Sequence, residues 1–335
     1  MMKDKQTPVR QASSLIVIPC LDEAAHIGAL LRQLRPAAAR LGARIVVADG
    51  GSTDGTREIV EKIAAGDPRV VLLANPKRIQ SAAINLAVAT FGDDADYLIR
   101  IDAHGGYPAD YCDRLVEDAL ATGAESVVVS MLTSGTGAVQ KAAAAAQNSR
   151  LGTGGSKHRH LSAGEWVDHG HHALMRIDAF RAVGGYDESF SHNEDAELDY
   201  RLRQAGRRIW MSGRTKMIYY PRSTLKSLYF QYLGYGRGRA RNVLKHRIMP
   251  KARQMIPLLV FPVVLLTALS PMFVAAAVPF LMWTAVCLGY GATIAIARRN
   301  PAIALAGVSV MVMHLGWSMG FWLQLLGPQP SREVA

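Results

Sequence analysis

The sequence of 335 residues contains few cysteines. Only Cys20, Cys112 and Cys287 are present, far apart in the chain. An odd and scattered set excludes a disulfide framework and a zinc site with paired cysteines, and it fits a reducing cytosol. The first 14 residues are polar and lack the apolar run of a signal peptide. We therefore expect the folded part to stay on the side of the membrane where it is made.

Acidic residues are absent from a long part of the chain. After Asp199 the next Asp or Glu is Glu333, whereas Arg and Lys recur throughout residues 201–253, and the formal net charge is +11. A basic segment beside an apolar one is typical of a cytoplasmic flank that touches anionic lipid head groups. No nucleic-acid-binding module is visible, so we expect membrane lipids and no nucleic acid as partners.

Charges of either sign are nearly absent from residues 255–326, where only Arg298 and Arg299 occur. Three apolar stretches there approach the ~20 residues that a membrane-spanning helix needs. These are residues 256–273, 274–297 and 302–326. The basic clusters before the first stretch and after the second predict that both sites are cytoplasmic. We predict three crossings, and a re-entrant hairpin made by the first two stretches, which contain prolines, is the alternative.

Glycine-rich phosphate-binding loops are missing as well. No G-x-G-x-x-G follows the first apolar run, and no G-x-x-x-x-G-K-S/T occurs anywhere. What the sequence does contain is an alternation of short apolar runs and amphipathic helical segments. The runs are residues 15–18, 44–48, 70–74, 97–101 and 126–131. This alternation predicts an α/β fold with a mostly parallel central sheet and right-handed crossovers.

Polar residues stand where three of these strands are expected to end. They are Pro19, Asp22, Glu23, Asp49, Asp102 and His104. Ligands of a parallel sheet bind at the carboxyl ends of its strands, so we predict one shared site. Asp49 can accept hydrogen bonds from a nucleotide base or ribose, and Gly50 lets the backbone come close. The alternative for this stretch is an ordinary tight turn.

Asp102-Ala103-His104 is the sharpest candidate for a metal site. Side chains alternate along a strand, so Asp102 and His104 are expected to leave its end on the same side. Together they can hold a divalent ion, Mg²⁺ or Mn²⁺, between the protein and a diphosphate. The alternative is that Asp102 caps the following turn and His104 is a loop histidine.

Three later stretches carry further candidates. Residues 152–160 combine glycines with basic groups and predict either a loop that closes over phosphates or a plain connector. His171 and His172 can serve as a further metal ligand or as acceptor contacts, although neutral hydrogen-bonded histidines are the default. Glu194 and Asp195 open a predicted helix. They are either helix-dipole partners or the carboxylates that take a proton from an attacking hydroxyl.

The order of these motifs resembles that of family 2 glycosyltransferases with the GT-A fold. The motifs are Ile-Pro-Cys-Leu-Asp-Glu, Val-Ala-Asp-Gly-Gly-Ser-Thr-Asp-Gly-Thr, Asp-Ala-His and Gly-Gly-Tyr-Asp-Glu followed by Glu-Asp. The resemblance implies an inverting, metal-dependent glycosyltransferase in which Asp195, beside Glu194, is the general base and Asp102 and His104 hold the metal. It also implies a set of residues in the nucleotide-sugar site: Pro19, Asp22, Glu23, Asp49, Gly50, Ser52, Arg78 and Asp102.

Within that family the chain is most similar to the glucosyltransferases of succinoglycan biosynthesis. This similarity implies a bacterial cytoplasmic-membrane enzyme that moves glucose from UDP-glucose onto a polyprenyl-diphosphate-linked sugar, through a β-1,3 bond, beside other polysaccharide-assembly enzymes. The residues we assign to the acceptor are His171, His172, Arg237 and Arg239. Two alternatives stay open: a polyprenyl-phosphate sugar synthase that uses a bare lipid phosphate, and a non-catalytic scaffold of a polysaccharide export complex.

These patterns predict five segments. Residues 1–13 form a polar tail, 14–220 a GT-A catalytic domain, and 221–254 a basic helical segment at the membrane surface. Residues 255–327 form the transmembrane region, and 328–335 a second tail.

Overall fold

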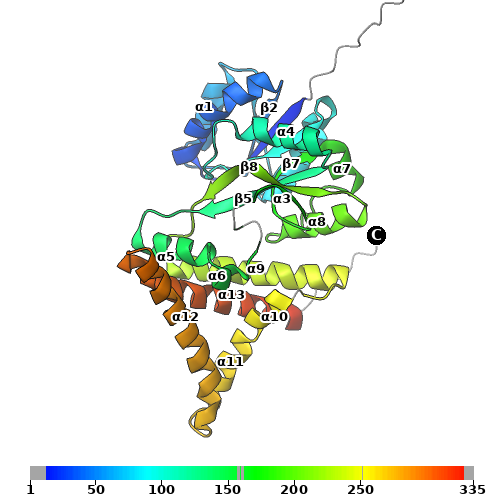
Figure 1. Ribbon diagram of the computed structural model, residues 1–335. Coiled ribbons are helices and arrows are strands. Elements are labelled where there is room, and N and C mark those ends of the chain that lie inside the picture. Colours follow the sequence, from blue (N-terminus) through cyan, green and yellow to red (C-terminus); the bar gives the residue numbers. More distant parts are fainter. Residues whose placement is uncertain (1–12, 157–158, 160–161, 251, 328–335) are drawn as a thin grey trace, which may run out of the picture.

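The computed structural model describes residues 13–156, 159, 162–250 and 252–327. The two predicted tails, apart from Ser13, lie outside the described residues, as does part of the predicted glycine-rich loop. An eight-stranded sheet forms the centre of the upper part of the molecule (Figure 1). Its order is β3-β2-β1-β4-β7-β5-β8-β6. The strands are β1 Ser14–Cys20, β2 Arg44–Asp49, β3 Val70–Ala74, β4 Tyr97–Arg100, β5 Ser126–Thr133, β6 Glu165–Val167, β7 His171–Arg176 and β8 Ile209–Tyr219.

The first four strands are parallel, and their connections are helical, as the alternation in the sequence predicts. The predicted α/β fold with a mostly parallel sheet is therefore confirmed. The second half of the sheet is mixed: β7 pairs antiparallel with both β4 and β5, and β6 pairs antiparallel with β8. Our sequence analysis did not predict β6, β7 or β8.

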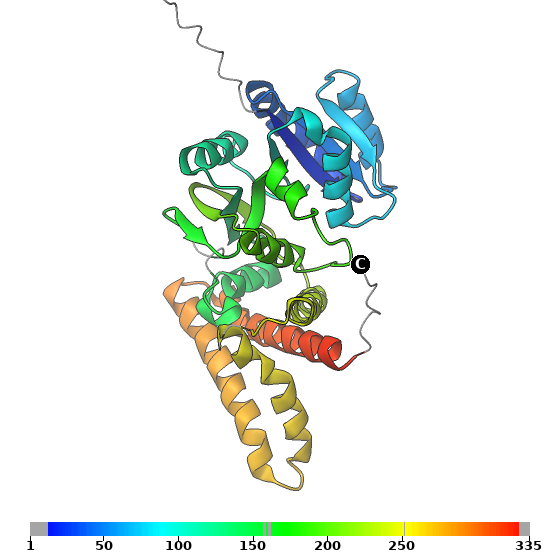
Figure 2. The same cartoon turned by 90° about the vertical axis from the view of Figure 1, so that its right-hand side faces the viewer.

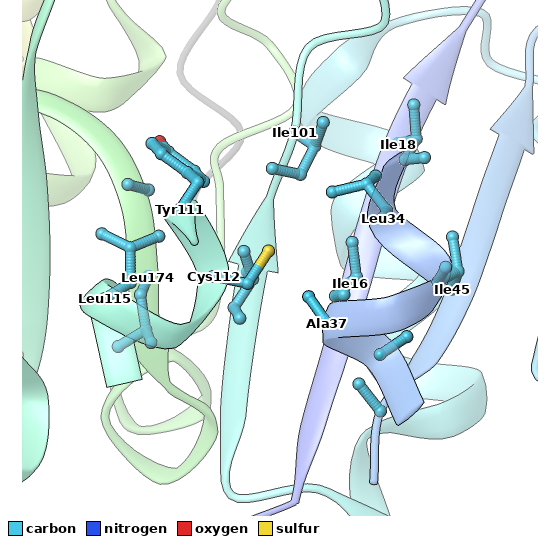
Figure 3. Packing of buried hydrophobic residues seen from close by; sticks show 14 of the residues in the cluster. Ile16, Ile18, Leu34, Ala37, Ile45, Ile101, Tyr111, Cys112, Leu115 and Leu174 are labelled. Carbon is cyan, nitrogen blue, oxygen red and sulfur yellow. The ribbon is translucent and has the colours of Figure 1, made fainter. Parts of the chain in front are cut away.

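Helices cover both faces of the sheet, and β1 shows why. Ile16 and Ile18 face one side and Leu15 and Val17 the other, because side chains alternate along a strand. On the first side lie α1 Ala24–Arg40 and α4 Tyr111–Thr122, with α2 Thr56–Ala64 against α1. On the second lie α3 Gln80–Phe91, α7 Ile177–Ala182 and α8 Glu194–Gln204. Figure 3 shows the first of these cores, where Leu34 and Ala37 of α1 meet Ile16 and Ile45.

A layer of helices lies beneath the sheet. We call it the helical layer; it consists of α5 Ala138–Gln147, α6 Arg150–Thr153, α9 Leu225–His246 and α13 Ala306–Leu326. Helices α9 and α13 run side by side in both views (Figures 1 and 2). They approach through glycines: a Cβ added at Gly320 would lie 2.1 Å from the carbonyl oxygen of Leu233. One added at Gly236 would lie 2.0 Å from that of Trp317.

A helical hairpin projects from this layer, away from the sheet (Figure 2). One arm consists of α10 Ala252–Leu258, α11 Val260–Leu266 and the 3₁₀ turn η3 Thr267–Leu269. The other consists of η4 Val274–Ala277 and α12 Val278–Ala297, and η5 Pro301–Leu305 then leads into α13. Because all these segments are apolar, the hairpin exposes many large hydrophobic side chains.

The structure differs from the sequence analysis in the length of the first predicted span, and the number of membrane crossings stays a prediction. Two helices among the described residues have the length and apolar character of a membrane span, Val274–Ala297 and Pro301–Leu326. The first predicted span is instead a shorter apolar segment, Gln254–Leu269, divided between α10 and α11. Prolines 257 and 262 explain the break, since proline removes a helix hydrogen bond. The last helix, α13, is half buried against the protein, whereas α12 is mostly exposed.

The packing of α9 against α13 generates a first prediction. Gly320→Ala places a methyl group against the Leu233 carbonyl, so we expect it to lower the free energy of unfolding by about 1–3 kcal/mol. Gly289→Ala, on α12, is the matched control, because nothing lies within 4 Å of its added Cβ. Thermal unfolding of both variants in the same detergent measures the difference. Equal loss of stability in the two variants would show that the contact is not tight.

Candidate active site

A cavity of about 750 Å³ lies between the carboxyl ends of the strands and the helical layer. Segments far apart in the sequence supply its polar wall: Glu23 follows β1, Asp102 follows β4, His171 begins β7 and Asp195 lies in the first turn of α8. Pro19, Arg78, His104 and Glu194 also line it. Most of the residues named from the sequence therefore line one cavity, and their functional roles stay predictions.

Arg100, the last residue of β4, occupies the centre of the polar wall. Since Arg100 and Asp102 are two residues apart, both leave the strand on the face covered by α8. The Arg100 guanidinium donates to Asp195 Oδ1 at 2.5 Å and to Asp102 Oδ1 at 3.3 Å, and its Nη2 lies 3.9 Å from Glu194 Oε1. Its side chain is only 5% exposed. One buried cation thus joins the metal-site strand to the carboxylates of α8.

The two acids of α8 differ in protonation. Burial raises the pKa of the Glu194 carboxyl, and the neighbouring Asp195 raises it further. Burial opposes ionisation of Asp195 too, but Arg100, His172 and His171 outweigh it and hold the pKa of Asp195 well below its usual range. Two acids with pKa values pushed in opposite directions favour distinct roles. Asp195 is the member that is ionised at neutral pH.

His171 and Asp102 are two metal-capable side chains that lie close together in the cavity wall. His171 Nε2 lies 3.6 Å from Asp102 Oδ2, beyond hydrogen-bond range, and burial lowers the pKa of His171 to about 4. The imidazole is therefore neutral, as a metal ligand must be. Mg²⁺ and Mn²⁺ usually take one or two protein carboxylates and complete their shell with substrate phosphates and water. Among the described residues no cluster of three metal-binding side chains occurs, so this pair fits a phosphate-assisted site only.

His104 departs from the predicted position. The turn after β4, closed by a hydrogen bond from Gly105 N to Asp102 O, carries its ring toward Glu23. His104 Nδ1 lies 2.7 Å from Glu23 Oε1, and the side chain is half exposed. Both Asp102 and His104 line the cavity, but the His104 ring pairs with Glu23. A role of His104 in holding the metal stays a prediction.

His172, a predicted acceptor contact, lies outside the cavity lining. It is fully buried, with Nε2 at 2.7 Å from Asp199 Oδ1 and Nδ1 at 2.6 Å from the Tyr186 hydroxyl. That hydroxyl in turn donates to Asp195 Oδ1 at 3.2 Å. Burial opposes protonation of His172, but Asp199 and Asp195 outweigh it and raise its pKa. His172 therefore lies behind Asp195 and does not line the cavity, whereas His171 does, and an acceptor contact of His172 stays a prediction.

Four predicted nucleotide contacts, Asp22, Asp49, Gly50 and Ser52, do not line the cavity in the described structure. Asp49 is 2% exposed, and its carboxylate accepts hydrogen bonds from Gly51 N at 2.9 Å and from Ser52. Asp22 accepts from Thr53 N at 2.9 Å. These side chains shape two loops that present Glu23 and Arg78, and direct contact with a nucleotide stays a prediction for them.

The two predicted acceptor arginines of α9 separate. Arg239 lines the cavity together with Gln231 and Tyr235, which lie about two turns and one turn before it on the helix. Arg237 lines a second hollow, of about 340 Å³, beside Phe230. The sequence analysis missed Arg100 and the cavity-lining Arg159. A charged residue inside the apolar run Tyr-Leu-Ile-Arg-Ile was a visible signal for Arg100.

Comparisons with known proteins agree with this geometry. Residues 15–184 match the family model described as "Glycosyl transferase family 2". The chain is 65% identical over 314 residues to "Succinoglycan biosynthesis protein ExoA" of Rhizobium meliloti (strain 1021), covering 94% of this chain and 95% of that protein. It also resembles the structure of mannosyltransferase PcManGT from Pyrobaculum calidifontis in complex with GDP-Man and Mn²⁺. That match has a TM-score of 0.58 and 16% identity, over 92% of this chain and 88% of that one, and shows a shared fold.

The buried cation generates a second prediction. Arg100→Met leaves Asp102 and Asp195 buried without their cation, so we expect a loss of about 3–5 kcal/mol in unfolding free energy at pH 7. Arg114→Met, which breaks a surface pair with Asp110, is the control and should cost about 1 kcal/mol or less. Chemical denaturation of the purified proteins measures both.

The same experiment has a pH arm. Arg100 lowers the pKa of both carboxyls below their ordinary 3.8, so its stabilisation is fully present above that value and is lost as the pH falls through the lowered values. In the variant the buried carboxyls take up protons at milder acidity, since the largest offset to their desolvation is gone. The difference in unfolding free energy between the unaltered protein and Arg100→Met should therefore narrow from pH 7 toward pH 4. A gap that is constant with pH would contradict the assigned pairing.

Proposed function

Because the chain belongs to glycosyl transferase family 2 and has the GT-A fold, we propose that it transfers glucose from UDP-glucose to a sugar carried on a polyprenyl diphosphate. The proposed bond is β-1,3, and the proposed setting is the assembly of a succinoglycan-like exopolysaccharide. The observation that carries the proposal is the cavity itself. It runs from Asp102 and Asp195 to Ile256 and Trp317, at the root of the apolar hairpin, so one space serves a polar donor and a lipid-borne acceptor.

Asp195 is the proposed general base. Its Oδ1 is held by Arg100 and Tyr186, which leaves Oδ2, 3.8 Å from His171 Nδ1, to face the cavity. An acceptor hydroxyl bound there would give its proton to Oδ2 as its oxygen attacks the anomeric carbon of the donor sugar. A single in-line displacement inverts that carbon, so an α-linked donor gives a β-linked product. Arg100 fixes the carboxylate before the substrate arrives.

Asp102 and His171 are the proposed holders of Mg²⁺ or Mn²⁺, with His104 as the further candidate from the sequence. The ion would neutralise charge that develops on the departing nucleoside diphosphate. Gln80 donates to Asp102 Oδ1 at 2.9 Å and so turns Oδ2 toward His171. Arg78, which lines the same end of the cavity, is placed to meet the donor phosphates.

The hairpin is the proposed membrane anchor, with the catalytic domain in the cytoplasm. Its tip exposes Met272, Phe273 and Val274, which are 76%, 63% and 82% exposed. Arg298 and Arg299 stand at the other end of α12, beside the protein, as expected for residues near anionic head groups. The backbone N–H groups of Ser270, Met272 and Phe273 are bonded within the tip, which suits an apolar solvent. We therefore favour insertion of both arms from one side of the membrane.

The decisive experiment pairs donors with acceptors. Purified protein in lipid nanodiscs is incubated with labelled UDP-hexoses and with either a polyprenyl-diphosphate-linked galactose or a bare polyprenyl phosphate. We expect label to become lipid-extractable with UDP-glucose and the glycosylated diphosphate, and Asp195→Asn to lower that rate by about 10²–10⁴-fold. Asp113→Asn, on the outer helix α4, is the control and should retain full rate.

The outcomes separate the alternatives. Transfer only to the bare phosphate would favour a polyprenyl-phosphate sugar synthase. Full activity of a folded Asp195→Asn protein that still binds UDP would remove Asp195 as the base. Absence of transfer from every donor, with UDP bound, would contradict the proposed reaction.

A further test concerns the anchor. Phe273→Asp puts a charge at the tip, which costs about 2.5 kcal/mol or more in the hydrocarbon centre, so we expect less of the protein to float with vesicles after detergent removal. Leu120→Asp, on α4, is the matched control because Leu120 is 62% exposed against 63% for Phe273. Equal flotation of the two variants would show that the tip does not enter the lipid.

A further inference from the structure

The lower half of the cavity contains a buried cation with no acidic partner. Arg159 is 9% exposed and donates from Nη1 to Thr133 Oγ1 at 3.1 Å. Among the residues that the structure describes, no carboxylate lies within ion-pair distance of its guanidinium. A buried charge without a counter-charge is costly, so such a site favours a ligand that brings the missing charge.

Three more arginines line the same cavity. Arg150 opens α6, Arg222 precedes α9, and Arg239 lies on the α9 face that carries Gln231 and Tyr235. Arg222 and Arg239 lie in the part of the sequence, from residue 200 to residue 332, that contains no Asp or Glu. A multiply charged anion is the ligand that such a group of guanidinium donors recognises.

Two neighbouring features identify the rest of the ligand. Gln231 is also 9% exposed, and its side-chain oxygen has no partner among the described residues, although it lines the cavity; a sugar hydroxyl can donate to it. At the opposite side the cavity wall is formed by Ile256 and Pro257 of α10 and by Trp317 of α13. Ile256 is 72% exposed, so the wall continues onto the apolar surface of the hairpin.

We propose that Arg159, Arg222 and Arg239 form a subsite for the diphosphate of a lipid-linked sugar, with the lipid chain leaving along Ile256 and Trp317. The inference rests on the proposed function for its acceptor and adds the place where that acceptor binds. Arg150 is a fourth donor at the rim of this subsite. The sugar then points toward Glu194 and Asp195, which line the same cavity as Arg159 and Tyr235.

A binding experiment tests this subsite apart from catalysis. The full-length protein in nanodiscs is titrated with farnesyl diphosphate, with inorganic pyrophosphate and, separately, with UDP. We expect the protein to bind farnesyl diphosphate more tightly than pyrophosphate. Arg222→Gln and Arg239→Gln should each weaken it by about tenfold or more, as expected for loss of a charge-assisted hydrogen bond. Arg239→Lys keeps the charge and should lose less affinity for farnesyl diphosphate than Arg239→Gln.

Arg237→Gln is the matched control. It removes the same charge from the same helix, two residues away, but Arg237 lines the other hollow. Farnesyl diphosphate affinity should not change in this variant, and UDP affinity should not change in any of them. If Arg159→Met folds, its farnesyl diphosphate affinity is measured as well. If it does not fold, the Arg222 and Arg239 variants alone test the subsite.

Three results would overturn the subsite. The first is a loss of farnesyl diphosphate affinity in Arg237→Gln as large as that in Arg239→Gln. The second is that the Arg222 and Arg239 variants lose affinity for UDP and not for farnesyl diphosphate. The third is that pyrophosphate binds as tightly as farnesyl diphosphate. The second would assign the arginines to the donor, and the third to a soluble anion. If no acceptor is ever glycosylated but farnesyl diphosphate binding depends on Arg222 and Arg239 as expected, the reaction is wrong and the subsite stands.

Discussion

The active-site geometry depends on a guanidinium buried among carboxylates. Arg100 lies 5% exposed between Asp102, Glu194 and Asp195, which come from β4 and α8. Removal of such groups from water is costly, and only complete pairing offsets that cost. The arrangement therefore tolerates little displacement of α8 relative to the sheet. A base held this way is oriented before any substrate binds, which is where much of the rate of a displacement reaction originates.

The first half of the fold was predictable, and the second half was not, for a physical reason. Buried parallel strands such as β1 and β2 are continuous apolar runs, which a sequence shows directly. Strand β7 begins with two histidines, so it does not read as a continuous apolar run in the sequence. Strand β8 carries Gly213 and Arg214 at its centre, where its pairing with β5 shifts register, so no regular alternation marks it.

In the candidate site, too, the sequence indicates which residues stand at strand and helix ends, but not where their side chains point. Strand ends located Asp102, and the first turn of a helix located Asp195, because both are local patterns. The direction of a side chain is not local: Asp49 turns into its own loop, and His104 turns to Glu23. On α9, Arg237 and Arg239 look equivalent in the sequence, yet two helical residues are about 200° apart, and only one can face the cavity.

Acidic and basic residues are separated along the chain, and the cavity lies where the two regions meet. Acids end with Asp199 in α8, and every charged residue that follows within the described chain, from β8 to α13, is basic. The cavity lies on that boundary, with ionised Asp195 on the side of the sheet and Arg239 on the side of the helical layer. For the proposed lipid-linked acceptor, this boundary would keep the phosphates beside the arginines, near the membrane, while the uncharged sugar reaches Asp195. The proposed donor would place its diphosphate at the Asp102 end, so the two proposed substrates would occupy separate halves of one space.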